Sequence, residues 1–496
     1  ILERSGDETE CGCIHHEKCG GCVYQTLPYE KQLEIKKQQV CRLIGNTLKN
    51  FDGAYAPDWF EGIEASPVIC EYRNKMEFSF GDEYMGGPLT LGMHLSGHYN
   101  DVTDTPECNI VDADFREVRN YTLSYFAKRN IRFYRRSARE GCLRHLLVRK
   151  GLRTGEILID LVTSSGDNVR LDEYVNGLLS IKLEGHIAGI LNTLNDTEGD
   201  AVVDQNTMVL YGKPFFYEEL LGLRFKITPF SFFQTNTAGA EVLYETARKY
   251  IHESLSGKIG TVFDLYSGTG TIAQMIAPEA SDVVGIEIVP EAVEAARINA
   301  ELNGLHNCKF LAGDVFAVMD GTEEKPDLII MDPPRDGATP RALAKILDYG
   351  VNNIIYISCK PTSLARDLNM ILSNGYRLER GKCIDMFPMT GGVETVCLLS
   401  KLHEAKHHVR VKLDMDEMDI TSAESKATYE EIKKYVAEHN DGMKASSLNI
   451  AQVKAKYGII ERENYNKTKS EEARQPVCPK DKEEAIVEAL KAFRMI

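Results

Sequence analysis

Residues 261–277, TVFDLYSGTGTIAQMIA, decide the fold of the central part of this 496-residue chain. An apolar run rich in β-formers leads into the turn SGTG, and an apolar helical pattern follows at once. Glycines at such a strand-to-helix turn let the backbone bend sharply and approach a ligand closely. The turn alone is weak evidence, because many tight strand–helix connections need glycine.

The sequence around this turn repeats the same rhythm. Further short apolar runs occur at 282–288, 308–314, 327–332 and 353–359, with helical patterns between them. Strands that alternate with helices predict a doubly wound, parallel α/β sheet whose ligands lie at the carboxyl ends of the strands.

Acidic residues end the next two strands. Glu287 follows the glycine turn at the distance expected of a residue that accepts both hydroxyls of a ribose, and Asp314 is placed to reach an adenine edge. A dinucleotide site would need G-x-G-x-x-G, which DLYSGTG does not supply, and the later MDPPRDG (331–337) has no place in a dehydrogenase. The combination resembles the class I S-adenosylmethionine-dependent methyltransferases.

The length predicts more than one domain. Residues 1–225 mix β-rich runs with helical stretches, which predicts an α+β region. Residues 226–402 hold the α/β alternation, and residues 403–496 are rich in Lys and Glu. Amphipathic patterns at 428–439, 446–458 and 479–493 predict a small helical extension, whose role the sequence does not reveal.

Composition and charge narrow the class of protein. A hydrophobic content of 43% is that of a globular protein, no apolar run of membrane-spanning length occurs, and no signal peptide is visible, so we expect a cytoplasmic protein. The net charge of −16 argues mildly against nucleic acid as a partner, but local patches decide such binding. Residues 128–150 are basic and interleaved with aromatic residues, which suits RNA as well as it suits a solvated face followed by a strand.

A cysteine and a carboxylate are candidates for covalent chemistry. Most of the 13 cysteines lie in apolar or amphipathic surroundings, as structural cysteines do. Cys359 instead closes the run 353–359 beside the expected cofactor, and Pro361 ends that strand. Glu394 follows the turn TGG and precedes an apolar strand, although a single Glu can also be a solvated surface charge. The pair suits a nucleophile with a nearby base.

Several motifs occur in one order along the chain, namely FFQTN (232–236), DLYSGTG (264–270), MDPPRDG (331–337), YISCKP (356–361) and DMFPMTGGVETVCLL (385–399). Together they resemble the RNA 5-methyluridine methyltransferase family, over roughly the first 400 residues. YRNKMEF (72–78) and LRHLLVRK (143–150) look similar to the substrate-binding domain of that family. One departure is Met389, where members of the family often have His.

The resemblance implies roles for individual residues. Cys359 would add to C6 of a uracil, and Glu394 would remove the proton from C5 after methyl transfer from S-adenosylmethionine. The cofactor and target-base pocket would be lined by Gln234, Tyr266, Thr271, Glu287, Asp314 and Asp332.

The amino-terminal cysteines form a separate candidate site. Cys13, Cys19 and Cys22 have the spacing C-x5-C-x2-C, and Cys108 is the best fourth ligand. Thiolates bind zinc or iron–sulfur clusters, and the spacing alone slightly favours zinc. The resemblance instead implies a [4Fe-4S] cluster, which the 23S ribosomal RNA branch of the family carries on this pattern.

The expected function is therefore C5-methylation of a specific uridine in 23S ribosomal RNA, the large-subunit RNA, by a monomeric protein without a membrane partner. The same chemistry on transfer RNA is the first alternative. A methyltransferase that acts on an exocyclic amine is disfavoured, because Arg335 stands where such enzymes have an aromatic residue. A non-catalytic iron–sulfur protein that binds RNA is disfavoured by the presence of both Cys359 and Glu394.

Overall fold

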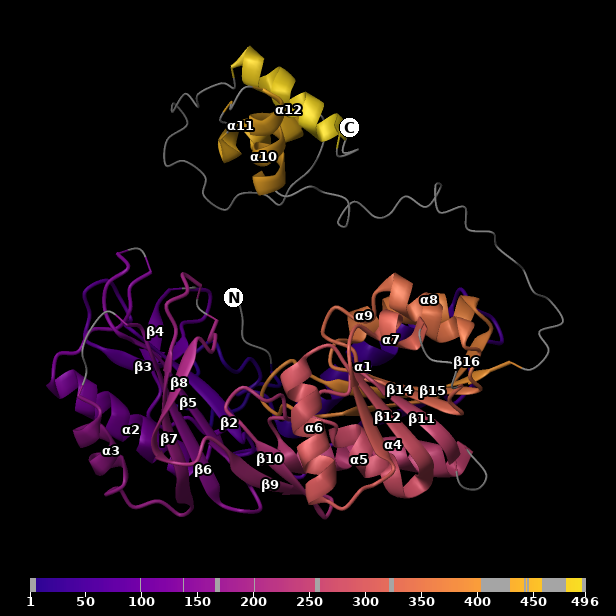
Figure 1. Ribbon diagram of the computed structural model, residues 1–496, viewed down its shortest axis with the longest axis horizontal. Coiled ribbons are helices and arrows are strands. Elements are labelled where there is room, and N and C mark those ends of the chain that lie inside the picture. Colours follow the sequence, from indigo (N-terminus) through magenta and orange to yellow (C-terminus); the bar gives the residue numbers. More distant parts are fainter. Residues whose placement is uncertain are drawn as a thin grey trace. The chain divides into compact units, whose positions relative to one another are not determined.

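The computed structural model describes residues 6–402, apart from 99, 137, 166–169, 200, 255–258 and 321–324, and then residues 429–440, 443, 446–456 and 479–492. The chain forms two compact units, Ile1–Ala405 and Lys406–Ile496 (Figure 1). No helix within these ranges is both long enough and apolar enough to cross a membrane.

A seven-stranded sheet organises one part of the first unit. Its order is β4-β3-β2-β5-β6-β7-β8, and among these strands the neighbours are antiparallel except for β6 and β7. The strands are β2 (Lys75–Gly81), β3 (Thr90–His94), β4 (Val102–Asp104), β5 (Leu143–Lys150), β6 (Glu156–Thr163), β7 (His186–Leu194) and β8 (Asn206–Gly212). Helices α2 (Ala113–Lys128) and α3 (Asp172–Leu178) pack against it around Phe78, Phe126 and Tyr174. The central strands β5 and β6 are almost wholly buried, which explains their continuous apolar runs.

A hairpin, β9 (Phe216–Leu220) and β10 (Leu223–Ile227), precedes the α/β part. The α/β elements are α4 (Thr237–Ser254), β11 (Ile259–Leu265), α5 (Thr271–Ile276), η1 (Ala277–Glu279), β12 (Ala280–Glu287), α6 (Pro290–Leu302), β13 (Cys308–Ala312), α7 (Val315–Asp320), β14 (Leu328–Met331), α8 (Pro340–Asp348), β15 (Asn353–Ser358), α9 (Pro361–Ser373), β16 (Tyr376–Ile384) and β17 (Glu394–Lys401).

The second sheet has the order β1-β16-β17-β15-β14-β11-β12-β13. Strands β15, β14, β11, β12 and β13 are parallel, as the sequence predicts. The sheet as a whole is mixed, because β17 runs antiparallel to both β15 and β16. This is the α/β class I methyltransferase fold, and the antiparallel strand matters because it begins at the carboxyl ends of the parallel strands.

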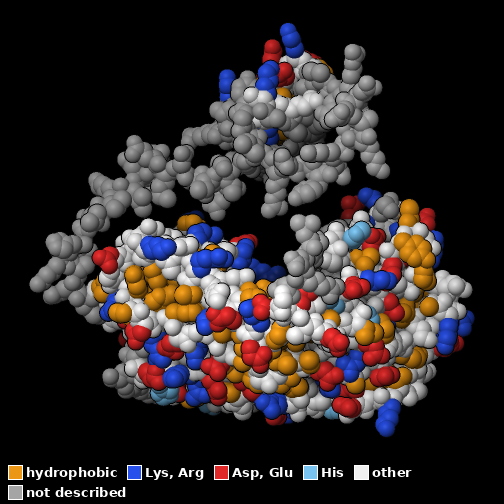
Figure 2. Space-filling view, turned by 180° about the vertical axis from the view of Figure 1, so that it is seen from behind, with side chains coloured by type: hydrophobic (Ala, Val, Ile, Leu, Met, Phe, Trp, Pro, Cys, Tyr) orange, Lys and Arg blue, Asp and Glu red, His pale blue; other side chains and the backbone are white. Residues whose placement is uncertain are grey.

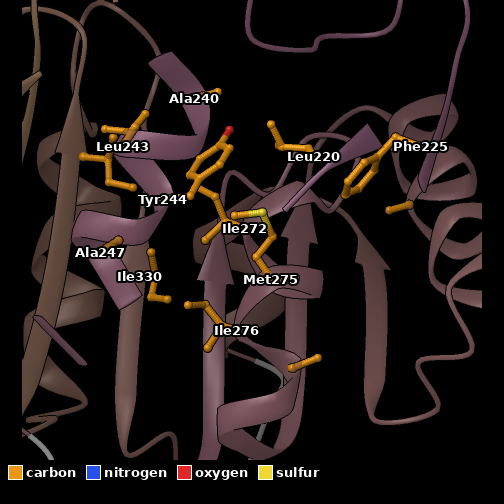
Figure 3. Close-up of a cluster of buried hydrophobic side chains, with 14 of the residues drawn as sticks. Leu220, Phe225, Ala240, Leu243, Tyr244, Ala247, Ile272, Met275, Ile276 and Ile330 are labelled. Atoms are coloured by element: carbon orange, nitrogen blue, oxygen red, sulfur yellow. The ribbon is translucent and has the colours of Figure 1, made fainter. Parts of the chain in front are cut away.

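Helices cover both faces of this sheet (Figure 1). On one face, side chains of α4 and α5 such as Leu243, Tyr244, Ile272 and Met275 pack with Ile330 of β14 (Figure 3). On the other face, α1, α8 and α9 bury the alternate side chains of the same strands in a second core cluster. Burial on both faces explains why the strands read as apolar runs rather than alternating patterns.

The structure differs from the predicted domain boundary at 225/226 in one respect. Helix α1 (Tyr29–Leu48) packs on α9, and β1 (Phe60–Glu64) pairs in parallel with β16 at the edge of the methyltransferase sheet. Residues 29–64 therefore belong to the α/β part, although they come long before it in the sequence. Their pairing is between distant segments, so no local pattern could indicate it.

The second unit contains three described helices, α10 (Tyr429–His439), α11 (Ser447–Lys456) and α12 (Lys480–Ala492). They lie within the segments for which the sequence predicts helices. Ile432, Val436, Ile450, Ile486 and Leu490 form a small core between them.

Candidate active site

The ends of the central strands bring the predicted catalytic residues to one edge of the sheet. Asp332 follows β14 and Cys359 follows β15, and these two strands are parallel neighbours. Because β17 is antiparallel to β15 with Ser358 opposite Thr395, Glu394 begins its strand beside Cys359. The three side chains interact electrostatically: the charges of Glu394 and Asp332 both raise the pKa of the Cys359 thiol.

The pKa values of these three side chains are all raised, which favours their uncharged forms. Burial raises the pKa of Glu394 to about 8, the charge of Asp332 adds to the shift, and Arg335 opposes it. Burial also raises the pKa of Asp332 to about 7. A carboxyl group whose pKa lies near neutral pH is suited to general acid–base catalysis. The pKa of Cys359 is raised chiefly by burial, and Arg335 counteracts this.

The glycine turn has the conformation that a cofactor loop requires. Gly270 has a φ of 75°, and a Cβ there would lie 2.7 Å from the ring of Phe310, so a side chain is excluded by both conformation and space. Tyr266 also has a positive φ, 64°, which is unusual for a residue with a side chain. Thr271 begins α5 and is buried, with its hydroxyl 3.5 Å from that of Thr269.

The two acidic strand ends flank this turn. Glu287 accepts hydrogen bonds from the Gly268 N–H and the Val289 N–H, each at 3.0 Å. Asp314 is exposed, and its charge raises the pKa of Tyr266, after the larger effect of burial, which together bring it to about 12. The structure therefore brings Tyr266 and Asp314 together.

Gln234 is positioned by the amino-terminal sheet. Its carbonyl accepts a hydrogen bond from Asn74 Nδ2 at 2.8 Å, and the Asn74 N–H donates to the Thr235 carbonyl at 2.9 Å. The buried guanidinium of Arg149 donates through Nη1 to the carbonyls of Thr228, Pro229 and Ser231, at 2.8, 3.0 and 2.8 Å. The loop that carries Gln234 is thus held by Asn74, just before β2, and by Arg149 of β5.

The sequence did not indicate Tyr244 or Arg335 as site residues. Tyr244 is 5% exposed in α4; burial raises its pKa, as do the charges of Asp332 and Glu394, whereas a hydrogen bond with Gln234 lowers it. The spacing of apolar residues in α4 made Tyr244 indistinguishable from a core aromatic. Arg335 is exposed, and its motif MDPPRDG indicates the class of methyltransferase without a role for the arginine itself.

Comparisons with known proteins bear on the family and the fold of this chain. A family model described as tRNA (Uracil-5-)-methyltransferase matches residues 219–402. A protein described as an uncharacterized RNA methyltransferase from Clostridium tetani is 49% identical over 80% of this chain and 85% of its own length. One from Caldanaerobacter subterraneus is 46% identical over 81% of this chain and 87% of its own length.

A solved structure also matches most of the first unit. The Pyrococcus abyssi tRNA (uracil-54, C5)-methyltransferase in complex with S-adenosyl-L-homocysteine superposes with a TM-score of 0.62 at 25% identity, over 80% of this chain and 88% of that chain. This chain belongs to the RNA 5-methyluridine methyltransferase family.

The candidate cysteine ligands of this family member surround one enclosed space. Cys13, Cys19, Cys22 and Cys108 line a cavity of about 40 Å³ together with His15, His16, Arg73 and Met76. Burial raises the pKa of Cys22 to about 12 and of Cys108 to about 11, with smaller contributions from neighbouring thiols. Among the described residues, no group of three or more His, Cys, Asp or Glu side chains is arranged to hold a single metal ion.

The arginines of the basic segment 128–150 fall into two groups, one buried and one at the surface. Arg144 and Arg149 are buried and donate to backbone carbonyls. Arg129 pairs with Glu173, and Arg132 and Arg139 pair with Glu140 and Glu198 at the surface. Figure 2 shows basic and acidic side chains interspersed over one face of the molecule.

Proposed function

We propose that this protein methylates C5 of a uridine in structured RNA, with S-adenosylmethionine as the methyl donor. The observation that carries the proposal is the meeting of Cys359, Glu394 and Asp332 at one sheet edge, beside a glycine turn of cofactor-loop conformation. C5 of uracil is a poor nucleophile until a thiolate adds to C6, so the reaction needs a cysteine and then a base.

The residues around the glycine turn fit S-adenosylmethionine. Glu287 would hold the ribose hydroxyls, and the exposed apolar side chains of Ile288 and Val289 would contact the adenine. Ser267 Oγ and Asp264 Oδ1 are buried without a hydrogen-bond partner in the described part of the chain, which leaves polar atoms for a ligand. Asp264 lies near Asp332 and Glu287, and a bound sulfonium cation would favour the charged forms of these carboxyls.

Each catalytic residue has a defined task. Cys359 Sγ forms a bond to C6 of the uracil, which makes C5 nucleophilic. Bound S-adenosylmethionine supplies an electrophilic methyl group. Glu394, as carboxylate, takes the proton from C5, the C5–C6 double bond re-forms, and the Sγ–C6 bond breaks to release the thiolate. Asp332 lies beside Cys359 and, with its pKa of about 7, is suited to accept the thiol proton.

The proposed substrate is 23S ribosomal RNA. Support comes from the cysteine set, which resembles that of the ribosomal RNA branch. Transfer RNA is the second candidate, because the Pyrococcus abyssi neighbour and the matching family model both bear the name of a transfer RNA enzyme. RNA contacts are proposed at a cavity of about 580 Å³ whose lining includes Arg132, Tyr134 and Arg139, because arginine and an aromatic ring suit phosphate and base.

We further propose that Cys13, Cys19, Cys22 and Cys108 hold a [4Fe-4S] cluster. Four thiols around one cavity fit the donor set of such a cluster. A single tetrahedral zinc ion needs thiolates about 3.8 Å apart, given Zn–S bonds of about 2.3 Å, and a cluster holds its ligands farther apart. The resemblance of the C-x5-C-x2-C pattern to that of the ribosomal RNA branch favours the cluster over zinc. Its role would be to brace the cysteine loop.

The test is methyl transfer from labelled S-adenosylmethionine to unmodified ribosomal and transfer RNA by anaerobically purified protein, with the product nucleoside identified by mass spectrometry. We expect 5-methyluridine in large-subunit RNA. We also expect a covalent adduct with RNA that contains 5-fluorouridine, and Cys359→Ala should abolish it. Label only in transfer RNA would refute the substrate assignment, and no 5-methyluridine in either RNA would refute the activity.

A further inference from the structure

The loop 385–393, which joins β16 to β17 and leads directly into Glu394, is held by the first part of the chain. Within this loop Met389 has a φ of 66°, a left-handed conformation that its side chain disfavours. A backbone of this kind persists only where its surroundings determine it. Side chains that contact this loop are therefore candidates for fixing the position of Glu394.

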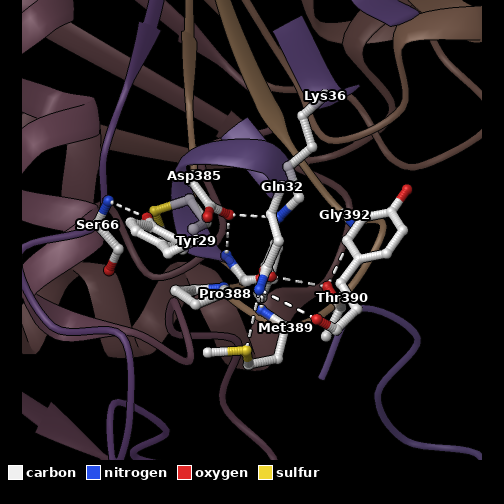
Figure 4. Close-up of polar contacts among 12 residues, drawn as sticks. Tyr29, Gln32, Lys36, Ser66, Asp385, Pro388, Met389, Thr390 and Gly392 are labelled. Carbon is white, nitrogen blue, oxygen red and sulfur yellow. Dashed lines mark hydrogen bonds and ion pairs between the residues drawn. The ribbon is translucent and has the colours of Figure 1, made fainter. Parts of the chain in front are cut away.

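Helix α1 supplies two of these side chains (Figure 4). Lys36 Nζ lies 2.6 Å from Asp385 Oδ1 and 3.0 Å from the Phe387 carbonyl, and neither charged side chain is exposed. Gln32, also fully buried, accepts a hydrogen bond from the Met389 N–H at 2.9 Å. Helix α1 thus forms hydrogen bonds with the beginning and the middle of the loop.

The cysteine loop and the segment before β2 contact the loop 385–393 as well. The N–H groups of Val23 and Tyr24 both donate to the Met389 carbonyl at 3.0 Å, directly after Cys22. The hydroxyl of Tyr72, 3% exposed, donates to the Pro388 carbonyl at 3.0 Å. The Tyr72 side chain lies near the cysteine cavity, since burial and the charges of Cys22 and Cys108 raise its pKa.

Strands β16 and β17 do not need these contacts in order to pair. Strands β16 and β17 already pair with each other along eight registered residue pairs, including Ile384 with Glu394. A hairpin of this kind tolerates many loop conformations, so the extra contacts select one. A buried ion pair adds little net stability, and its best-attested use is to specify one arrangement.

We propose that Tyr72, Gln32 and Lys36 are positioning residues that hold the loop 385–393 so that Glu394 faces C5 of the bound uracil. This inference rests on the proposed function. Its effect falls on one step: the Glu394 carboxylate takes the C5 proton, the C–H electron pair forms the C5–C6 double bond, and the C6–Sγ bond breaks with its electron pair returning to Cys359. Addition of Cys359 to C6 and methyl uptake do not need Glu394.

Tyr72→Phe tests this assignment with the loss of one hydroxyl. Tyr376→Phe is the matched control, because the Tyr376 hydroxyl is also buried and donates to a backbone carbonyl, that of Val351, at 2.8 Å. Gln32→Met is a second variant that acts on the Met389 N–H. Melting temperatures of all variants verify that each is folded before its kinetics are compared.

Two rates are measured in single turnovers on the full-length protein with RNA from the activity assay. With ordinary uridine RNA, Tyr72→Phe should slow release of methylated RNA by about tenfold, as expected for a misplaced catalytic group, and the methylated covalent adduct should accumulate on denaturing gels. With 5-fluorouridine RNA, which cannot lose its C5 substituent as a proton, the adduct should form at the wild-type rate within about twofold, far less than that tenfold effect.

The outcomes separate the possibilities. Release from Tyr72→Phe and Gln32→Met at the rate of Tyr376→Phe would overturn the inference. Equal slowing of adduct formation and release would also overturn it, because that result indicates general structural damage. A wild-type protein that makes no 5-methyluridine would defeat the proposed function instead, before the loop is tested.

Discussion

Replacement of Glu394 by Gln should make the protein more stable at high pH while it blocks turnover. Glu394 is 3% exposed, and its pKa is raised from 4.5 to about 8, first by burial and then by the charge of Asp332. At about 1.4 kcal/mol per pKa unit, ionising this side chain in the folded protein costs on the order of 5 kcal/mol. Gln keeps the shape of the side chain and never carries the charge.

The sign of the effect follows from proton binding. Between about pH 4.5 and pH 8 the folded protein holds a proton on Glu394 that the unfolded chain releases, so the stability of the wild type falls as pH rises through this window. We expect Glu394→Gln to match the wild type near pH 4.5 and to exceed it by several kcal/mol near pH 9. For a unit of this size, each kcal/mol corresponds to roughly 1–2 °C in melting temperature.

The assay is thermal unfolding from about pH 5 to pH 9, with Glu291→Gln, an exposed position in α6, as control. Glu394→Gln should also accumulate the methylated covalent adduct with RNA that contains ordinary uridine. Product release by the wild type should accelerate as pH rises through about 8, where Glu394 becomes a carboxylate. A difference in melting temperature that is independent of pH, or a less stable Glu394→Gln at about pH 9, would refute the reasoning.

Three further substitutions test other parts of the site. Gly270→Ala should weaken binding of S-adenosyl-L-homocysteine at least tenfold by calorimetry, because the new Cβ would lie 2.7 Å from Phe310, and about 1.4 kcal/mol corresponds to tenfold. Arg149→Met should lower the melting temperature, since the carbonyls of Thr228, Pro229 and Ser231 lose their donor, and a buried acceptor left without a partner costs about 1–3 kcal/mol. Arg132→Gln with Arg139→Gln should weaken RNA binding and reduce its salt dependence by a slope of about 2, with methyl transfer at saturating RNA unchanged.

Residues at the ends of parallel strands could be predicted from the sequence. Glu287, Asp332 and Cys359 each close an apolar run, and the rule that ligands bind at carboxyl strand ends needs no knowledge of the helices. Pairing of β15 with β17 then brings Glu394 beside Cys359. The sequence placed Glu394 at the start of a strand, but not the direction of that strand.

Residues that act across long separations could not be predicted. Lys36 in a helical pattern and Asp385 before an FP pair each look like ordinary polar positions, and only folding brings their side chains to 2.6 Å. Tyr244 carries the apolar spacing of a core residue, and its hydrogen bond with Gln234 depends on the packing of α4 against the sheet. A pattern within one element cannot reveal which distant element it meets.

The basic segment 128–150 shows the same limit for predictions that are based on charge. Arg149 belongs to a run that resembles an RNA-binding patch, yet it is 1% exposed, and burial lowers its pKa to about 9. Its contacts with the carbonyls of the loop 228–231 explain why a cation is retained inside the protein. Charge counting along the sequence therefore overestimates the surface available to RNA, and burial decides which arginines can reach it.

The catalytic part of this protein is accordingly not one continuous segment of the sequence. Residues 226–402 contain the proposed nucleophile and the proposed base, but the edge of their sheet is completed by β1, and Asp385 is neutralised by Lys36 from α1. Without Lys36 the Asp385 carboxylate would be buried and unpaired, which costs about 3–5 kcal/mol. The loop before Glu394 would also lose the donors from Val23, Tyr24 and Tyr72. The amino-terminal region is thus part of the proposed active site, because it contacts the loop that leads into Glu394.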